Sequence, residues 1–339
     1  MGKRECGLPF PFLVNDPFGD PALVIDFLFE SRALMIDLGD IHALSPRYLL
    51  RVSDIFISHC HMDHFMGFDW LVRIRLGREG GLRLYGPPGF LHQVESKLAG
   101  YTWNLVHNYE NDFVITATEV HEDGASRRAD FPMRRAFRRE NETSFCKADL
   151  VLLDEPGFLV RCAFLDHRTP CLAFALEERR HVNVWKNCFE EKGLPVGSWL
   201  KQLKQAVLED RTPDTPVIGP DGRPRPLAVL LDCVRLTPGM KIAYVTDAAF
   251  SPGNAERIQA LAMGADKLFI EAVFAHEMAA RAREKHHLTA AQAGWLAHRA
   301  GAKSVVPFHH SPVYHDREAL LRQELEDHFR RGAMPESPG

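Results

Sequence analysis

The stretch Ser58-His59-Cys60-His61-Met62-Asp63-His64 places three histidines and one aspartate within seven residues. Side chains two positions apart on an extended chain point to the same side, so His59 and His61 face one way. Asp63 and His64 follow at the expected turn into a helix, which crowds four ligand-type side chains into one small volume. Nitrogen and oxygen ligands of this kind suit zinc, with manganese and iron as alternatives. The stretch therefore predicts a metal site.

Three further candidate ligands share the placement of His59, which follows an expected strand over Asp54–Ser58. They are His167 after Phe158–Leu165, Asp247 after Lys241–Thr246, and His309 after Ser304–Phe308. Because the ends of strands in α/β sheets meet at one edge, we expect the four segments to converge there. Together they would complete two adjacent metal sites.

Expected strands and helices alternate along the chain, which indicates the α/β class. The other expected elements are a hairpin of Ala22–Phe29 and Ala33–Asp37, a helix opened by Ser45-Pro46, a helix over Phe65–Leu76, strands over Phe113–Val120, Cys171–Leu176, Leu227–Asp232 and Lys267–Val273, and helices opened by Ser251-Pro252 and by the capping box of Thr289 and Gln292.

From Glu177 to Pro226, prolines, glycines and charges interrupt the pattern, which predicts a flexible arm (177–226) inserted in a single domain that spans residues 1–339. The basic run Arg127–Lys147 is interpreted as a solvated loop, and its role stays open.

The composition narrows the class of protein. With 45% hydrophobic residues and a formal net charge of -4, the chain resembles an ordinary globular protein rather than one coated in nucleic acid. The seven cysteines are scattered without a Cys-x-x-Cys pair, which argues against a disulfide framework and fits a reducing cytosol. Because neither a signal peptide nor a bilayer-long apolar run is recognised, we expect a cytoplasmic protein without a membrane partner.

The His-x-His-x-Asp-His pattern resembles that of the metallo-β-lactamase superfamily. Later segments are similar to ribonuclease Z, and the resemblance runs from about Ala33 to Tyr314. These segments are Leu165–Cys171 for the third ligand, Tyr244–Asp247 for a bridging aspartate, Glu271–Phe274 and His287–Ala290 for an additional catalytic histidine, His309–Tyr314 for the last ligand, and Gly193–Lys204 for a tRNA-gripping arm. His310 falls on a position that is not a ligand in that family, and His286 stands beside the matching His287.

The resemblance implies a four-layer αββα sandwich, with helices outside two facing sheets. It implies two zinc ions, one held by His59, His61 and His167, the other by Asp63, His64 and His309, with Asp247 bridging them. Asp63 would then orient or deprotonate the attacking water, and His287 would donate a proton or a hydrogen bond. The implied reaction is removal of the 3′ trailer from precursor tRNA by a homodimer whose arm holds phosphates.

Three departures from ribonuclease Z lie outside the metal ligands. Met1–Arg32 lacks the expected glycine-rich, basic start, Ser198 stands at a usual proline, and Val313 stands at a usual arginine. The two-metal phosphodiesterase chemistry is therefore better supported than the tRNA substrate.

The alternatives differ in kind. One is a hydrolase of the same fold that acts on a small phosphodiester, a cyclic nucleotide or a lactone, and fold-level analogy does not choose between it and the tRNA nuclease. An iron-based redox enzyme is disfavoured because His61 stands where that class usually has a carboxylate. A binding protein with a degenerate site is disfavoured by the full ligand set.

Overall fold

The structure is a computed structural model of the chain and describes residues 9–27, 31–147 and 149–335. The chain divides into two compact units: a larger unit of residues 1–176 and 241–339, and an inserted unit of residues 177–240. Parts of two sequence predictions, the unusual opening Met1–Arg32 and the strand Ala22–Phe29, therefore lie outside the described residues. No helix of the described residues is long and apolar enough to cross a bilayer.

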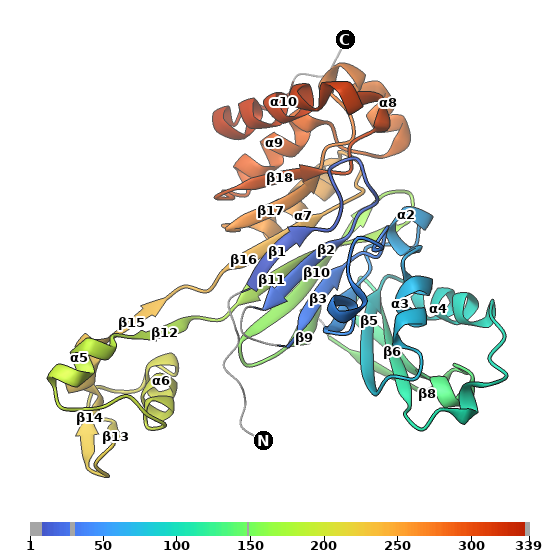
Figure 1. The fold of residues 1–339 in the computed structure, drawn as a ribbon. Helices are drawn as coiled ribbons and strands as arrows, with labels where there is room; N and C mark the ends of the chain where they lie inside the picture. Colours follow the sequence, from blue (N-terminus) through green and yellow to red (C-terminus); the bar gives the residue numbers. More distant parts are fainter. Residues whose placement is uncertain (1–8, 28–30, 148, 336–339) are drawn as a thin grey trace. The chain divides into compact units, whose positions relative to one another are not determined.

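The first sheet of the larger unit runs in sequence order from β1 to β8 (Figure 1). Its strands are β1 (Pro9–Leu13), β2 (Leu23–Phe27), β3 (Ala33–Ile36), β4 (Val52–Phe56), β5 (Gly80–Gly86), β6 (Phe113–Val120), β7 (Ala125–Pro132) and β8 (Glu140–Cys146). β3 to β6 are parallel, whereas the strands at both ends pair antiparallel. The predicted hairpin of β2 and β3 is confirmed for the described residues.

The second sheet has the order β18-β17-β16-β11-β10-β9, so its strands do not follow the sequence order. Its strands are β9 (Val151–Asp154), β10 (Phe158–Asp166), β11 (Pro170–Glu178), β16 (Lys241–Val245), β17 (Lys267–Glu271) and β18 (Val305–Phe308). β16, β17 and β18 are parallel. Their carboxyl ends therefore meet at one edge of the sheet, as predicted for the strands before Asp247 and His309. The strand before His59, β4, is expected at the same edge but belongs to the first sheet.

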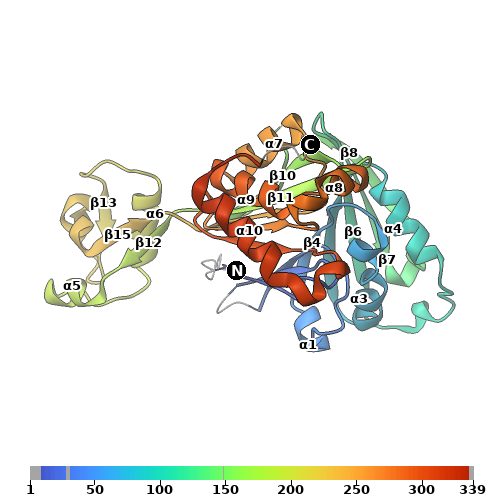
Figure 2. The ribbon, with the colours of Figure 1, turned by 90° about the horizontal axis from the view of Figure 1, so that it is seen from above.

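Helices cover the outer faces of the two sheets (Figure 2). They are α1 (Pro46–Leu49), α2 (Met62–Phe65), α3 (Phe68–Arg75), α4 (Phe90–Ala99), α7 (Pro252–Ala262), α8 (Ala279–Lys285), α9 (Ala290–Arg299) and α10 (Glu318–Arg331), with the 3-10 turns η1 (Val106–Asn108), η2 (Met133–Arg135), η4 (His276–Met278) and η5 (Pro312–Arg317). α4 packs on β6 and β7, α7 on β10 and β16, and α9 on β17 and β18. Between the sheets, Phe27 stacks on Phe158 and Phe56 contacts Phe174. The predicted αββα sandwich is therefore confirmed.

The helix predicted over Phe65–Leu76 is wrong in one respect, because it is interrupted at Gly67. The Gly67 N–H donates to the Leu38 carbonyl at 2.8 Å, and a Cβ at Gly67 would lie 2.4 Å from the Gly39 carbonyl oxygen. This close contact with the loop after β3 ends α2 and starts α3 in a new direction.

The solvated loop predicted over Arg127–Lys147 is wrong as well. Most of this run forms β7 and β8, which pair as an antiparallel hairpin. Interspersed acids pair with three of its six arginines: Arg127 and Arg139 both contact Glu142, at 2.6 and 2.8 Å, and Arg135 contacts Glu140 at 3.1 Å. The basic run is thus an ion-paired edge of the first sheet.

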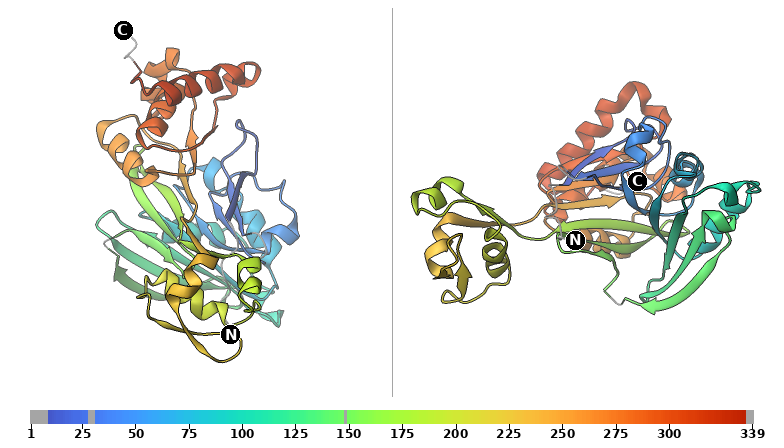
Figure 3. Two further views of the ribbon diagram at one scale, coloured as in Figure 1. Left: turned by 90° about the vertical axis from the view of Figure 1, so that its left-hand side faces the viewer. Right: turned by 60° about the horizontal axis from the view of Figure 1, so that its bottom comes forward.

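The inserted unit, drawn from green to yellow in Figure 3, has its own small core. Its elements are β12 (His181–Val184), α5 (Lys186–Glu191), α6 (Leu200–Leu208), β13 (Pro216–Ile218), β14 (Pro224–Pro226), η3 (Leu227–Cys233) and β15 (Val234–Thr237). The strand predicted over Leu227–Asp232 is wrong, since these residues form the 3-10 helix η3. A disulfide joins Cys188 to Cys233, which corrects the expectation of no disulfide. Cys60, Cys146, Cys162 and Cys171 are free, and Cys6 lies outside the described residues.

Candidate metal centre

The stretch that follows β4 folds as its pattern predicts. His61 is extended, with φ -63° and ψ 157°, and α2 begins at the next residue, so Asp63 and His64 lie in its only turn. The rings of His59 and His61 lie 4.3 Å apart, as do those of His59 and His64. The strand-to-helix turn therefore gathers all four side chains.

The three later segments reach the same place from the edge of the second sheet. His167 follows β10, Asp247 follows β16 and His309 follows β18. The rings of His59 and His167 are 5.4 Å apart, and those of His64 and His309 are 5.2 Å apart. The structure thus brings together every residue that the sequence proposed as a ligand.

Asp247 lies between two sets of side chains and is almost fully buried. Its Oδ2 is 3.7 Å from His59 Nε2 and 3.4 Å from His167 Nε2. Its Oδ1 is 3.4 Å from His64 Nε2 and 3.0 Å from His309 Nδ1. Ligand atoms of His59, His61, His167 and Asp247 form one compact group, and those of Asp63, His64 and His309 form another.

The donor set fits metal ions. His64 Nε2 and His309 Nδ1 are buried and lie 3.4 and 3.0 Å from Asp247 Oδ1, but neither makes a hydrogen bond of good geometry with the described residues. Buried polar atoms without a partner are costly, so their retention points to an ion between them. Neutral imidazoles and carboxylates at these separations are the ligands that zinc and related ions take.

The pKa shifts show which way the cluster is charged. Burial and the neighbouring His64 lower the pKa of His59 to about 2, which keeps its ring in the neutral form that binds metal. Burial opposes protonation of His309, but Asp247 and Asp63 raise its pKa to about 10. The carboxylates of Asp63 and Asp247 therefore stabilise positive charge beside them. That charge is either a proton on a histidine ring or a metal ion.

Asp37, at the end of β3, orients one of the candidate ligands from outside the cluster. This fully buried carboxylate accepts hydrogen bonds from the Ser58 N–H (2.7 Å), the Ser58 hydroxyl (2.8 Å), the Tyr244 hydroxyl (2.9 Å) and His64 Nδ1 (2.9 Å). With Nδ1 held in this way, Nε2 of His64 points to Asp247. Such outer contacts fix the tautomer and direction of a metal-binding histidine.

Replacement of Asp37 by alanine is expected to destabilise the protein by about 3–5 kcal/mol, because it leaves several buried donors without an acceptor. Metal affinity should fall roughly 10- to 100-fold as His64 loses its orientation. Urea unfolding and competition with a chelating dye measure the two effects. Tyr244→Phe, which removes a single hydrogen bond, is the matched control at about 1 kcal/mol; an Asp37→Ala effect no larger than this would contradict the assignment.

His287 lies beside the cluster, after α8. The chain leaves α8 through His286, whose left-handed backbone (φ 59°) turns its carbonyl towards His167 Nδ1 at 2.8 Å. His287 Nδ1 is 2.8 Å from Glu271 Oε2 and 3.9 Å from Asp247 Oδ2. Burial would lower the pKa of His287, but Glu271 and Asp247 raise it above its ordinary value. This histidine therefore favours the protonated form at the edge of the cluster.

Glu271 orients His287, and no role is predicted for it individually from the sequence. It is fully buried at the end of β17 and also accepts hydrogen bonds from the Ala248 and Leu288 N–H groups, at 2.8 and 3.1 Å. Two sequence signals point to it: an acid that ends the apolar run Lys267–Glu271, and its position in the segment Glu271–Phe274 that resembles ribonuclease Z. His310, in contrast, turns away: its Nδ1 pairs with the Ala272 carbonyl at 2.8 Å.

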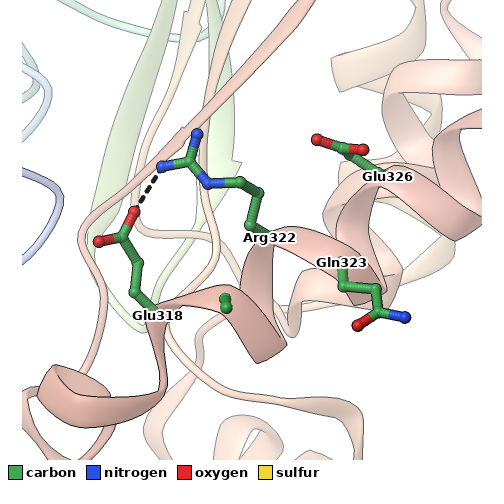
Figure 4. A pocket seen from close by; sticks show the side chains of 5 residues that line it. Glu318, Arg322, Gln323 and Glu326 are labelled. Atoms are coloured by element: carbon green, nitrogen blue, oxygen red, sulfur yellow. Dashed lines mark hydrogen bonds and ion pairs between the residues drawn. The ribbon is translucent and has the colours of Figure 1, made fainter.

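A surface hollow of about 360 Å³ lies elsewhere, along α10 (Figure 4). It is lined by Glu318, Ala319, Arg322, Gln323 and Glu326, and Glu318 pairs with Arg322. None of the candidate metal ligands lines it, so the hollow is not connected with the chemistry of the cluster.

Comparison with known proteins gives the class and then the family. No protein-family model matches the chain. The structure is similar to a metallo-β-lactamase fold protein of Bacillus subtilis, YhfI, with a TM-score of 0.54 and 14% identity over 95% of this chain and 94% of that one. It is also similar to the short form of human tRNase Z, with a TM-score of 0.52 and 17% identity over 90% and 93% of the two chains. The chain therefore has the metallo-β-lactamase fold, with a histidine–aspartate cluster that suits a metal cofactor.

The sequence is 31% identical to ribonuclease Z of Deinococcus radiodurans over 297 residues, which cover 86% of each chain. It is 29% identical to ribonuclease Z of Bacteroides thetaiotaomicron over 301 residues, 87% of this chain and 81% of that one. The chain belongs to the ribonuclease Z family.

Proposed function

We propose that the protein is a dinuclear, metal-dependent phosphodiesterase that removes the 3′ trailer from precursor tRNA and leaves a 3′ hydroxyl on the tRNA. The observation that supports two metals most directly is the position of Asp247, whose two oxygens face different sets of histidines. The relatives named ribonuclease Z support RNA as the substrate.

The side chains divide into two ligand sets that share Asp247. His59, His61 and His167 would hold one ion, and Asp63, His64 and His309 the other. Zinc suits these ligands, and manganese or iron are alternatives. Such ions supply Lewis acidity for the phosphate and make water acidic enough to act as a nucleophile near neutral pH.

Asp63 is the residue placed to orient or deprotonate the attacking water. Its side chain is 41% exposed, whereas that of Asp247 is 3% exposed, so Asp63 is the carboxylate of the cluster that solvent reaches. Burial would raise the pKa of Asp63, but the hydrogen bond from His309 and the charge of His64 hold it below its ordinary value. Asp63 is therefore ionised and able to accept a hydrogen bond from water.

His287 is placed to protonate the 3′ oxygen that leaves with the tRNA. Glu271 holds its Nδ1, which leaves Nε2 as the atom that donates the proton. The phosphate stays on the trailer, and the tRNA keeps the hydroxyl that this proton completes.

The inserted unit would bind the body of the substrate through phosphate contacts. Lys201 is exposed on α6, in the segment that resembles the tRNA-gripping arm. Basic side chains on such a unit contact the backbone of RNA without reading its sequence. The unit would therefore add affinity for large substrates and none for small ones.

Deletion of residues 179–239 is expected to weaken binding of precursor tRNA at least about tenfold and to spare hydrolysis of a small chromogenic diester. The Glu178 N–H donates to the Met240 carbonyl at 2.9 Å, so two glycines suffice to rejoin the chain. Filter binding and diester turnover measure the two effects. An equal loss of both would show that the unit serves the fold of the protein rather than the substrate.

The first test is incubation of the zinc- or manganese-loaded protein with a precursor tRNA, alongside the same RNA without its trailer. A single cut at the start of the trailer, absent in Asp63→Ala, is the expected result. Val313, which is 61% exposed where related chains are expected to carry arginine, favours a second candidate, hydrolysis of a small phosphodiester. Survival of the RNA together with turnover of a simple diester would favour that candidate.

We also propose that the protein is a cytoplasmic homodimer, as the resemblance to ribonuclease Z implies. Light scattering of the purified protein tests the dimer, and the mass of a single chain would contradict it. Fractionation of the cells that make the protein tests its location.

A further inference from the structure

The inserted unit has a small hydrophobic core, and almost all of it lies in one stretch of chain. The core residues are Val182, Phe189, Leu194, Trp199, Leu203, Ala206, Val207, Val217, Leu227, Leu230 and Cys233. All but Val182 lie between Cys188 and Cys233. Units of this size rarely gain enough stability from packing alone, and they are commonly stapled by a covalent bond or a metal.

The disulfide joins the two ends of this stretch of chain. β12 pairs with β15, and their ladder ends at Val184 and Val234. Directly beyond it, the Trp185 N–H donates to the Cys233 carbonyl at 2.9 Å. The Cα atoms of Cys188 and Cys233 are 5.4 Å apart and 45 positions apart in sequence. The bond thus ties α5 to the end of η3, directly before β15, and the loop that it closes contains α6, β13 and β14.

The two cysteines of the disulfide differ in exposure from one another, and Cys188 is more exposed than the free cysteines Cys162 and Cys171. Cys188 is half-buried at the start of α5, whereas Cys233 is fully buried. Among the free cysteines, burial raises the pKa of Cys162 to about 12 and that of Cys171 well above its ordinary value. A thiol reagent therefore reaches Cys188 before it reaches the buried cysteines.

We propose that the Cys188–Cys233 disulfide is a redox-sensitive lock on the fold of the inserted unit. In the unlocking direction, a thiolate of a dithiol reductant attacks Cys188 Sγ, and Cys233 leaves as a thiolate. The second thiolate of the reductant then attacks the mixed disulfide, which frees Cys188 and oxidises the reductant. In the locking direction, oxidised glutathione supplies the disulfide that is exchanged, and two molecules of glutathione leave.

The consequence for activity rests on the proposed function, in which the inserted unit holds the body of the RNA. With the bond closed, the unit is ordered and binds large substrates. With the bond open, the closed loop gains chain entropy, the unit opens more often, and large substrates bind less well. Small diesters need only the metal centre and are turned over equally in both states.

The test uses the full-length, zinc-loaded protein, equilibrated with glutathione buffers that range from oxidising to reducing. Mass spectrometry after thiol blocking measures the state of Cys188 and Cys233. Limited proteolysis within residues 177–240 measures how often the inserted unit opens. Cleavage of precursor tRNA and of bis(p-nitrophenyl) phosphate is followed in the same samples. The double variant Cys188→Ser with Cys233→Ser reports the permanently open state, and Cys146→Ser, at an exposed free cysteine on β8, is the matched control.

Reduction is expected to speed proteolysis of the inserted unit on the order of 100-fold in the wild type and in Cys146→Ser. The double variant should be cut at the fast rate in every buffer. kcat/KM for precursor tRNA should fall at least about tenfold on reduction, and turnover of the small diester should not change. Proteolysis does not depend on the substrate. If the RNA is uncut in both redox states, the proposed function is overturned, and the proteolysis rates still decide whether the disulfide locks the inserted unit.

Four results would overturn the lock. The first is a pair of free thiols in oxidised glutathione. The second is proteolysis of the inserted unit at the same rate in both redox states. The third is cleavage of precursor tRNA at the same rate in both redox states. Protection of the reduced unit by added zinc would also overturn it, because Cys188, Cys233 and Asp232 would then act as a metal site.

Discussion

Asp247→Ala is expected to strip the protein of bound metal and to lower kcat/KM for a small diester at least about 1000-fold, which corresponds to about 4 kcal/mol of transition-state stabilisation. The reason is the position of its carboxylate, whose Oδ2 lies 3.4 Å from His167 Nε2 and whose Oδ1 lies 3.0 Å from His309 Nδ1. Loss of this one side chain therefore disrupts both ligand sets at once. A small diester is the right substrate here because the result then does not depend on RNA binding.

Metal content by elemental analysis and turnover of bis(p-nitrophenyl) phosphate check this expectation. Asp247→Asn keeps the shape and one acceptor but removes the charge, so it should retain more metal than Asp247→Ala and still lose most activity. Glu256→Ala, at an exposed acid on α7, is the control and should behave as the wild type. Unchanged metal content and turnover in Asp247→Ala would refute the bridging role.

His287→Ala is expected to keep both metals and to slow cleavage of RNA roughly 100- to 10,000-fold. The loss should be much smaller for bis(p-nitrophenyl) phosphate, because p-nitrophenolate leaves without a proton whereas the 3′ oxygen of RNA does not. This difference between leaving groups separates an acid from a residue that merely shapes the site. His92→Ala, at an exposed histidine on α4, is the control.

The role of His287 as an acid also predicts how the rate of RNA cleavage depends on pH. His287 acts in its protonated form, and Glu271 raises its pKa, so cleavage should fall as the pH rises through that pKa. Glu271→Gln removes the charge, lowers the pKa of His287 and should move this alkaline limb to lower pH. If the alkaline limb of the pH–rate profile does not move in Glu271→Gln, the role of Glu271 is purely structural.

Much of the site could be predicted because its residues combine a local pattern with a position at a strand end. His59 follows β4 of the first sheet, whereas His167, Asp247 and His309 follow strands of the second sheet, and the strand ends of both sheets meet at this site. The orienting residues Asp37 and Glu271 could not be recognised in this way. Each is a single acid at the end of an apolar strand, and its partners, such as Tyr244 and His287, come from distant parts of the chain.

The errors in the predicted elements have the same origin. Helical periodicity continues through Gly67, and only the contact with Gly39 breaks the helix there. The charges of Arg127–Lys147 indicate a loop until the pairing of β7 with β8 brings the Glu142 carboxylate within 2.6 Å of the Arg127 guanidinium. Leu227–Asp232 is apolar enough for a strand, but it forms η3 and packs into the core of the inserted unit. In each case a contact from another element overrides the local preference.

The adjacent ends of the inserted unit also matter for how the chain folds. β11 and β16 are neighbours in the second sheet, yet the whole unit separates them in sequence. Once β12 has paired with β15, the ends of β11 and β16 are already close. Pairing of β11 with β16 then closes a short loop instead of one as long as the inserted unit, so it is faster. Growth of the second sheet would then follow folding of the inserted unit. Variants that weaken the β12–β15 ladder should slow refolding of the larger unit even though they change none of its residues.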